Sequence, residues 1–171
     1  MIIREAKESD VLRILEIFNE ALIHSTSVYA YEPATLKDQL DWFHHKIDDG
    51  YPVYIGVENE LVIGYATYGS FRTRPAYKYT IEHSVYVDVQ HRNKGYGKAL
   101  LKFLIDKATE SGYKTMVGGI DSANLASIQL HLECGFSYSG MIHNAGYKFG
   151  KWLDLAFYQL DLEGPTSPEE K

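Results

Sequence analysis

The spacing of apolar residues predicts helices and strands over nearly the whole chain. Two early helices have apolar residues three or four positions apart, Val11, Ile14, Leu15, Phe18 and Leu22 in the first and Leu36, Leu40, Phe43 and Ile47 in the second. Thr35 and Asp38 match a capping box before the second helix. A third helix is predicted to contain Ala99 to Ala108, and a short fourth covers 124–133. In the fourth helix, Leu125, Ile128 and Leu132 are expected to face inward.

Strands are predicted between and after these helices. Their expected ranges are 2–6, 52–57, 61–70, 80–89, 114–121, 138–145 and 152–162. This order is typical of an α+β fold in which helices flank a mixed, mostly antiparallel central sheet. We expect a single domain over 1–163 and a disordered tail over 164–171, because the tail is rich in Pro, Ser and Glu.

Composition and charge narrow the class of protein. The 171 residues, of which 45% are apolar, suit one compact domain, and the net charge of -6 argues against a nucleic-acid partner. Cys134 is the sole cysteine, which excludes an internal disulfide and favours the cytoplasm. Charges at Arg4, Glu5 and Lys7 argue against a secretory signal, and no apolar run is long enough for a membrane span.

The strongest local pattern lies between the fourth predicted strand and the third predicted helix. It reads V-D-V-Q-H-R-N-K-G-Y-G-K over 87–98. A helix N-terminus has free N–H groups and a partial positive charge, and glycines let the backbone approach a phosphate. Arg92, Lys94 and Lys98 add positive charge. The pattern therefore predicts a pyrophosphate site, with a glycine-rich turn that only starts a helix as the structural alternative.

Two better-known phosphate motifs do not fit this segment. The P-loop requires a hydroxyl residue where Ala99 stands, and the dinucleotide fingerprint requires a third glycine where Leu100 stands. The R-x-x-G-x-G pattern of 92–97 instead resembles the GNAT superfamily of N-acetyltransferases. Three further segments narrow the resemblance: F-R-x-R-P-A-Y at 71–77, E-H-S-V-Y-V at 82–87 and G-Y-K-x-G-x-W-x-D at 146–154. They resemble the phosphinothricin, methionine sulfone and methionine sulfoximine N-acetyltransferase branch over about 2–162.

The resemblance implies the acyl-CoA N-acyltransferase fold, acetyl-CoA as co-substrate, no metal and a homodimer. It implies that the backbone of Val85, Tyr86 and Val87 pairs with the pantetheine arm. The pyrophosphate is implied to lie on the motif that follows, formed by Arg92, Asn93, Lys94, Gly95, Tyr96, Gly97 and Lys98. Asn124 matches a further cofactor contact, although an Asn at this place also caps a helix.

Amine acetylation needs a base for the substrate ammonium, a donor for the developing oxyanion and an acid for the leaving thiolate. Glu82 is the candidate base, because apolar and aromatic neighbours in the sequence would raise its pKa; an exposed or salt-bridged Glu is the alternative. His131 is the candidate acid, at the place where many GNAT enzymes have a Tyr, with a structural or substrate-binding histidine as alternatives. The backbone N–H of Val87 is implied as the oxyanion donor.

Two other routes are disfavoured by position. Cys134 lies late in a short helix, where the helix dipole raises the thiol pKa and opposes a covalent acetyl-cysteine route. The histidines at 44, 45, 83 and 91 lie on separate elements without metal-ligand spacing. We therefore expect direct transfer between two bound reactants.

The substrate is predicted from the loop before Glu82. Arg72 and Arg74 suit a carboxylate, phosphinate or sulfone group, and a solvated loop is the alternative. The other candidate substrate contacts are Tyr29, Pro75, Ala76 and Tyr77, with Tyr31 and Trp152 as further aromatic walls. These residues predict a small amino-acid-like amine, such as phosphinothricin, methionine sulfone or methionine sulfoximine, whose acetylation would detoxify it. The alternatives are another amine (a polyamine, an aminoglycoside or a protein N-terminus) and an acetyl-CoA-binding module without turnover.

Overall fold

The central sheet contains every strand of the described residues. The computed structural model describes residues 1–170, and Lys171, the last residue of the expected tail, lies outside them. Within that range, seven strands form one sheet in the order β1-β2-β3-β4-β5-β7-β6. They are β1 (Ile2–Glu5), β2 (Val53–Glu58), β3 (Leu61–Ser70), β4 (Thr80–Val87), β5 (Thr115–Asp121), β6 (Ser137–Lys148) and β7 (Lys151–Asp161).

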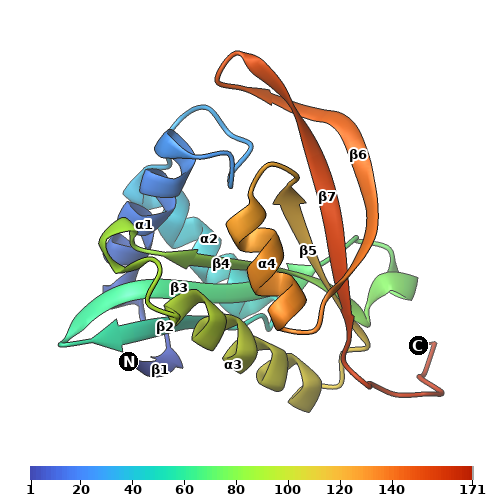
Figure 1. Cartoon of the computed structure of the whole chain (residues 1–171). Helices are drawn as coiled ribbons and strands as arrows, with labels where there is room; N and C mark the ends of the chain where they lie inside the picture. The colour runs from blue at the N-terminus through green and yellow to red at the C-terminus, as the bar shows by residue number, and fades with distance from the viewer. Residues whose placement is uncertain (171) are drawn as a thin grey trace.

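Helices cover both faces of this sheet (Figure 1). One face carries α1 (Val11–His24) and α2 (Leu36–Asp48), and the other carries α3 (Tyr96–Glu110) and α4 (Leu125–Glu133). The alternation of side chains along a strand explains how both faces become buried. Val53 and Ile55 pack in a cluster with α1 and α2, whereas Tyr54 between them packs in a second cluster with α3. The prediction of an α+β fold with a mostly antiparallel sheet is confirmed.

The sheet divides at β4 and β5. These two strands are the parallel pair of an otherwise antiparallel sheet, and their pairing covers Thr80 to Glu82 against Thr115 to Val117. Beyond Glu82 the partner of β4 is β3 alone, and beyond Val117 the partner of β5 is β7 alone. A fork therefore opens in the middle of the sheet, and Glu82 lies where it begins.

Some predictions about individual residues are wrong. Leu36 and Ile47 are exposed on α2, and Leu125 and Leu132, expected to face inward, are exposed on α4. The buried residue of α4 is instead His131, because its ring packs against the buried ring of His83 in β4. Val89 also lies outside β4, in a 3₁₀ turn (Val89–His91).

β6 is longer than predicted, whereas β7 has the predicted length and begins one residue earlier. They form a hairpin whose turn, at Phe149 and Gly150, has two residues with positive φ. Residues 162–170 contain no helix or strand. No helix within residues 1–170 combines the length and the apolar character needed to cross a membrane.

Candidate active site

A groove follows β4 from the fork to the start of α3. Its volume is about 610 Å³, and α4 forms its other wall. It brings together ten of the predicted site residues, namely Val85, Val87, Arg92, Asn93, Gly95, Tyr96, Gly97, Lys98, Asn124 and His131. Two of the predicted cofactor residues do not line it. Lys94 is exposed, and Tyr86 lies on the other face of the sheet, where its ring centroid is 5.2 Å from that of Tyr65.

The turn before α3 has a backbone conformation suited to an anion. Asn93 and Gly95 have φ of 61° and 82°, in the left-handed region. Gly95 is the N-cap of α3, and its lack of a side chain leaves the next N–H groups uncapped. The first N–H bonded within the helix is that of Ala99, to the carbonyl of Gly95. The amides of Tyr96, Gly97 and Lys98 therefore point out of the helix start toward the groove.

The cationic side chains of this turn are already paired. The Arg92 guanidinium donates to Glu20 of α1 at 2.5 Å and to the carbonyl of Val87 at 3.1 Å. Lys98 donates to Glu133 of α4 at 2.7 Å. These ion pairs neutralise charges that the sequence pattern assigned to the cofactor. The uncapped amides are therefore the main anion-binding groups of the turn.

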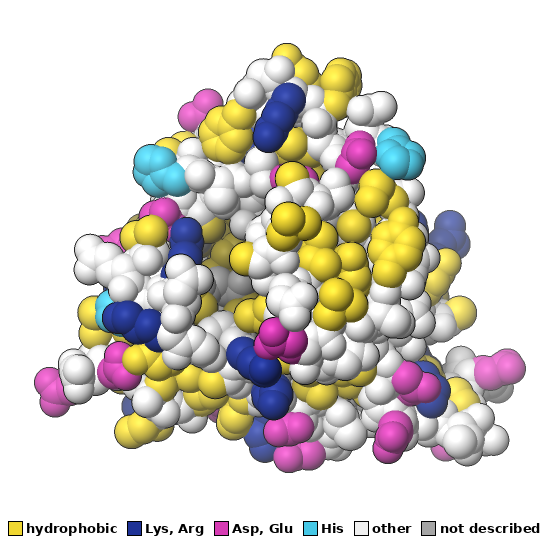
Figure 2. All heavy atoms as spheres, viewed as in Figure 1, with side chains coloured by type: hydrophobic (Ala, Val, Ile, Leu, Met, Phe, Trp, Pro, Cys, Tyr) yellow, Lys and Arg dark blue, Asp and Glu magenta, His cyan; other side chains and the backbone are white. Residues whose placement is uncertain are grey.

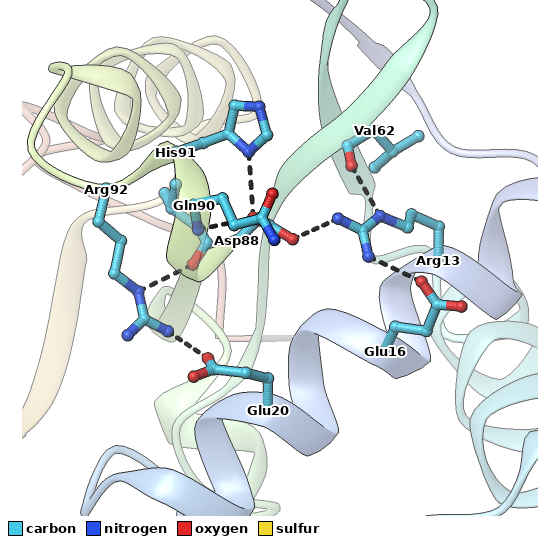
Figure 3. A network of polar contacts seen from close by, with 9 residues as sticks. Arg13, Glu16, Glu20, Val62, Asp88, Gln90, His91 and Arg92 are labelled. Carbon is cyan, nitrogen blue, oxygen red and sulfur yellow. Dashed lines mark hydrogen bonds and ion pairs between the residues drawn. The ribbon is translucent and has the colours of Figure 1, made fainter.

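A second contact with α1 fixes the other end of the turn (Figure 3). The Asp88 carboxylate accepts bonds from the Gln90 amide at 2.8 Å, from His91 Nδ1 at 3.0 Å and from the Arg13 guanidinium. Arg13 also donates to the carbonyl of Val62 in β3. The pKa of Asp88 is lowered because these bonds outweigh its partial burial. Asp88 therefore holds the turn against both α1 and the sheet.

The open edge of β4 supplies two further backbone donors. The Asp88 amide donates to the carbonyl of Ile63, and Tyr86 is opposite Tyr65 in the same register. Bonded and non-bonded pairs alternate in an antiparallel ladder, so the amides of Val85 and Val87 point away from β3. No strand of the described residues pairs with them on that side. The fork thus exposes two N–H groups to the groove.

Glu82 points to the opposite side of the sheet from the groove. Its neighbours in β4 divide by alternation: Tyr86 packs on the α1 side, whereas Ile81 and Val85 pack on the α3 side. Burial raises the pKa of Glu82. No hydrogen bond or ion pair of the Glu82 carboxylate occurs among the described residues that would oppose this effect. The raised pKa expected from the sequence is confirmed, and it suits a general base.

Gly119 of β5 makes room for this carboxylate. A Cβ at Gly119 would lie 3.1 Å from Glu82 Oε1, closer than an ordinary contact. The preceding residue, Gly118, has the same function on the other face, where a Cβ would lie 2.9 Å from His83 Nε2 and 3.1 Å from His131 Nε2. The sequence analysis missed this glycine pair. Two adjacent glycines within an otherwise apolar strand were the available signal.

His131 lies at the back of the groove and is paired with His83. The two Nε2 atoms are 3.0 Å apart, and His131 Nδ1 is 2.6 Å from the carbonyl of Ser127. Burial lowers the pKa of His131, and burial together with the facing ring lowers the pKa of His83 to about 3. Both imidazoles are therefore neutral near pH 7, which leaves the predicted acid role of His131 without a spare proton.

These features can now be compared with known proteins. The acetyltransferase (GNAT) domain family matches residues 3–157. An L-methionine sulfoximine/L-methionine sulfone acetyltransferase of Salmonella typhimurium is 41% identical, with 99% of each chain covered. A phosphinothricin N-acetyltransferase of Streptomyces viridochromogenes is 33% identical over 97% of this chain and 90% of its own. The chain belongs to the GNAT acetyltransferase family.

A solved GNAT structure agrees over the whole chain. It is that of an acetyltransferase from Salmonella typhimurium with its cofactor acetyl-CoA. The TM-score is 0.95 at 41% sequence identity, and the match covers 99% of this chain and 98% of that one. The protein is therefore a GNAT acetyltransferase in both sequence and fold. No group of three or more His, Cys, Asp and Glu side chains within residues 1–170 is arranged to hold a metal ion.

A second cavity of this GNAT domain adjoins the groove at Val85, Val87 and Arg92. It has a volume of about 530 Å³. Its walls include Asp121 at the end of β5, together with residues that the sequence analysis did not select, Ser25, Thr26, Ser27, Phe149 and Lys151. Asp121 is buried and accepts a hydrogen bond from Thr26. Loop residues and a carboxylate from distant parts of the chain meet here, so no local sequence pattern marked them.

The loop between α1 and α2 is held over this cavity by β6. Lys148 Nζ donates to three carbonyls of the loop region, those of Leu22 at 2.5 Å, Ser25 at 2.9 Å and Val28 at 2.8 Å. The Tyr29 ring fills the space above Gly146, where a Cβ would lie 2.6 Å from Tyr29 Cδ2. The predicted substrate residue Tyr29 thus packs against β6 and does not itself line the second cavity, although Ser27 in the same loop does.

The other predicted substrate residues lie elsewhere in this chain. Pro75, Ala76 and Tyr77 form a 3₁₀ turn at the start of β4, and Arg72 stacks on Phe71. Neither these residues nor Arg74 line the groove or the second cavity. The structure brings Tyr29 close to the second cavity but does not bring the 72–77 loop there.

Proposed function

We propose that the protein transfers the acetyl group of acetyl-CoA to the α-amino group of a small L-amino-acid-like substrate. The observation that carries this proposal is the fork, which has free β4 amides and uncapped α3 amides on one side and a buried carboxylate on the other. The groove fits coenzyme A, because Tyr96, Gly97 and Lys98 offer amides to a pyrophosphate and Val85 and Val87 offer amides to an extended arm.

Glu82 acts as the base in this proposal. The substrate ammonium gives one proton to its carboxylate, either directly or through a water molecule. The amine nitrogen then forms a bond to the thioester carbonyl carbon, and the Val87 amide stabilises the negative oxygen. The C–S electron pair leaves on sulfur, and the second proton lost by the nitrogen passes through solvent to the thiolate, which gives the amide and free coenzyme A. Burial raises the pKa of Glu82, and a carboxylate with a raised pKa is a stronger base than an exposed one.

The substrate class follows from the relatives. Proteins named for methionine sulfoximine and sulfone are 41% identical to this chain, and one named for phosphinothricin is 33% identical. We propose the same class here, with acetylation as a means of detoxifying these compounds. The walls of the second cavity, Asp121 with Lys151, suit a zwitterion because they offer both charges.

We further propose a homodimer that works in the cytoplasm. Large apolar side chains are exposed along the β6–β7 hairpin, with Tyr138 at 56%, Phe149 at 58% and Trp152 at 63% exposure. Figure 2 shows apolar surface over this side of the molecule. A second copy of the chain would cover this apolar surface. The 72–77 loop, which lines neither cavity of its own chain, would then contact the second copy. Size-exclusion chromatography with light scattering should give twice the monomer mass.

The deciding experiment incubates the protein with acetyl-CoA and one amine at a time. Methionine sulfone, methionine sulfoximine and phosphinothricin should each gain the mass of one acetyl group while free thiol is released. Spermidine, kanamycin and a ribosomal-protein N-terminal peptide test the other amine classes, and Glu82→Gln is the matched control. Acetylation of one of those amines alone would replace the substrate class. Tight acetyl-CoA binding without thiol release on any amine would contradict the enzyme assignment.

A further inference from the structure

The buried pair of His83 and His131 has a proton arrangement that the contacts define. His83 lies on β4 and His131 on α4, with ring centroids 5.0 Å apart and planes inclined by 22°. Phe136 packs edge-on against both rings. The two side chains are 8% and 5% exposed. Water therefore has little access to their nitrogens.

The hydrogen bonds determine which nitrogen carries each proton. The Ser127 carbonyl can only accept, so His131 Nδ1 must carry the proton that it donates. A neutral His131 then has a lone pair on Nε2, and the Nε2 of His83, 3.0 Å away, must be the donor. His83 Nδ1 is left with a buried lone pair and no partner among the described residues.

The surroundings keep both rings neutral. Gly118 lies directly beneath the two Nε2 atoms and contributes no polar side chain. Glu82, the nearest carboxylate in the sequence, points to the other face of the sheet. The interactions that lower the pKa of His83 are burial and the facing His131, and burial does the same for His131 against the bond to Ser127. No acidic side chain of the described residues acts on either ring to favour an imidazolium.

We propose that His83 is a positioning residue whose Nε2–H donates to Nε2 of His131 and so occupies the lone pair that remains when the Nδ1 proton of His131 is held by Ser127. The consequence for catalysis rests on the proposed acetyl transfer. His131 then offers no proton to a departing sulfur, because its one N–H is bound by Ser127 and its other nitrogen is occupied. His131 instead shapes the groove as a rigid, uncharged wall beside the thioester.

The unpartnered Nδ1 atom of His83 lowers the stability of the folded protein. A buried acceptor without a donor destabilises the folded state by about 1–3 kcal/mol. Reversing the tautomers does not remove the cost, because His83 Nδ1 would then be a buried donor without an acceptor. Replacing His83 by an apolar residue would remove it, but would also release His131. Retention of a polar side chain here is consistent with a function in orienting its neighbour.

The test compares two variants by nuclear magnetic resonance and by kinetics. Long-range ¹H–¹⁵N spectra of the wild-type protein should show His83 protonated on Nε2, His131 on Nδ1, and no titration of His83 between about pH 5 and pH 8. His83→Gln keeps a donor near the same place and should preserve both the His131 tautomer and the pH profile of turnover. His83→Phe removes the donor and leaves the Nε2 lone pair of His131 free, so the ¹⁵N resonance of His131 Nε2 should shift away from its hydrogen-bonded value.

The control is His45→Gln, the same substitution at an exposed histidine of α2, which should change neither spectrum nor profile. The proposal is overturned if wild-type His83 is protonated on Nδ1, or if His83→Phe leaves the ¹⁵N resonance of His131 Nε2 unchanged. The wild-type spectrum decides even if His83→Phe fails to fold. The spectra need no substrate, so a protein that acetylates nothing would end the proposed function without affecting this result.

Discussion

At the scale of single residues, two neighbours in β4 have different surroundings. Glu82 and His83 are adjacent in sequence, but the pleat of the strand directs them to opposite faces of the sheet. Gly118 and Gly119 leave space for the imidazoles on one face and the carboxylate on the other. These two adjacent side chains therefore have opposite shifts: the pKa of Glu82 is raised and the pKa of His83 is lowered.

Glu82 should determine the acid limb of the pH profile. Only the carboxylate can accept the ammonium proton, so turnover should rise with pH through the pKa of Glu82, which burial raises above 4.5. Activity is therefore lost as the pH falls, and the loss begins at a higher pH than for an exposed Glu. Glu82→Gln should lower kcat by about 10²- to 10⁴-fold and remove this limb, measured by thiol release. The Kd of acetyl-CoA, measured by calorimetry, should stay the same; an unchanged kcat would exclude Glu82 as the base.

The two glycines of β5 should respond differently to the same substitution. Gly118→Ala places a Cβ against two packed rings that cannot move, so we expect a loss of about 1–3 kcal/mol in the free energy of unfolding. Gly119→Ala meets the flexible end of Glu82, so its main effect should be a lower kcat with a smaller loss of stability. Urea denaturation and steady-state kinetics separate the two. Equal losses of stability would show that the rings are free to adjust.

At the scale of elements, the sequence predicted those with a strong local pattern. The helical stripe of Val11, Ile14 and Leu22 is buried as expected, and the glycine-rich turn starts α3. The orientation of α4 could not be predicted in the same way. Its apolar residues point in several directions, and the buried face is decided by His83, which is 48 positions away in the sequence. The partners of Arg92 and Lys98 were missed because Glu20 and Glu133 lie on other helices.

The turn before α3 allows a matched test of its backbone. Gly95 and Gly112, at the start and beyond the end of α3, have φ of 82° and 78°, and a Cβ at either meets nothing within 4 Å. Alanine at either position should cost about 1–2 kcal/mol of stability through backbone strain. Gly95→Ala should also weaken acetyl-CoA binding, because it displaces the amides that follow it, whereas Gly112→Ala should not. Equal acetyl-CoA affinities in the two variants would place the pyrophosphate elsewhere.

At the scale of the whole molecule, the sequence predicted the layers better than the cavities. Element order and strand patterning were sufficient for a helix-covered, mostly antiparallel sheet, whereas the free edge of β4 was expected only from the family resemblance. The second cavity was not foreseen, because Thr26, Asp121 and Lys151 meet only after the hairpin folds over the α1–α2 loop. The 72–77 loop lines neither cavity of its own chain, so its assignment to the substrate stays a prediction.

The division of the sheet at β4 and β5 also has a kinetic consequence. The groove proposed for coenzyme A adjoins the second cavity proposed for the amine at Val85, Val87 and Arg92, so both reactants can be bound at the same time. Initial rates at varied concentrations of both should give intersecting lines, and coenzyme A should compete with acetyl-CoA but not with the amine. Parallel lines would instead require an acetylated protein between two half-reactions. The enzyme should therefore bind both reactants before it releases either product.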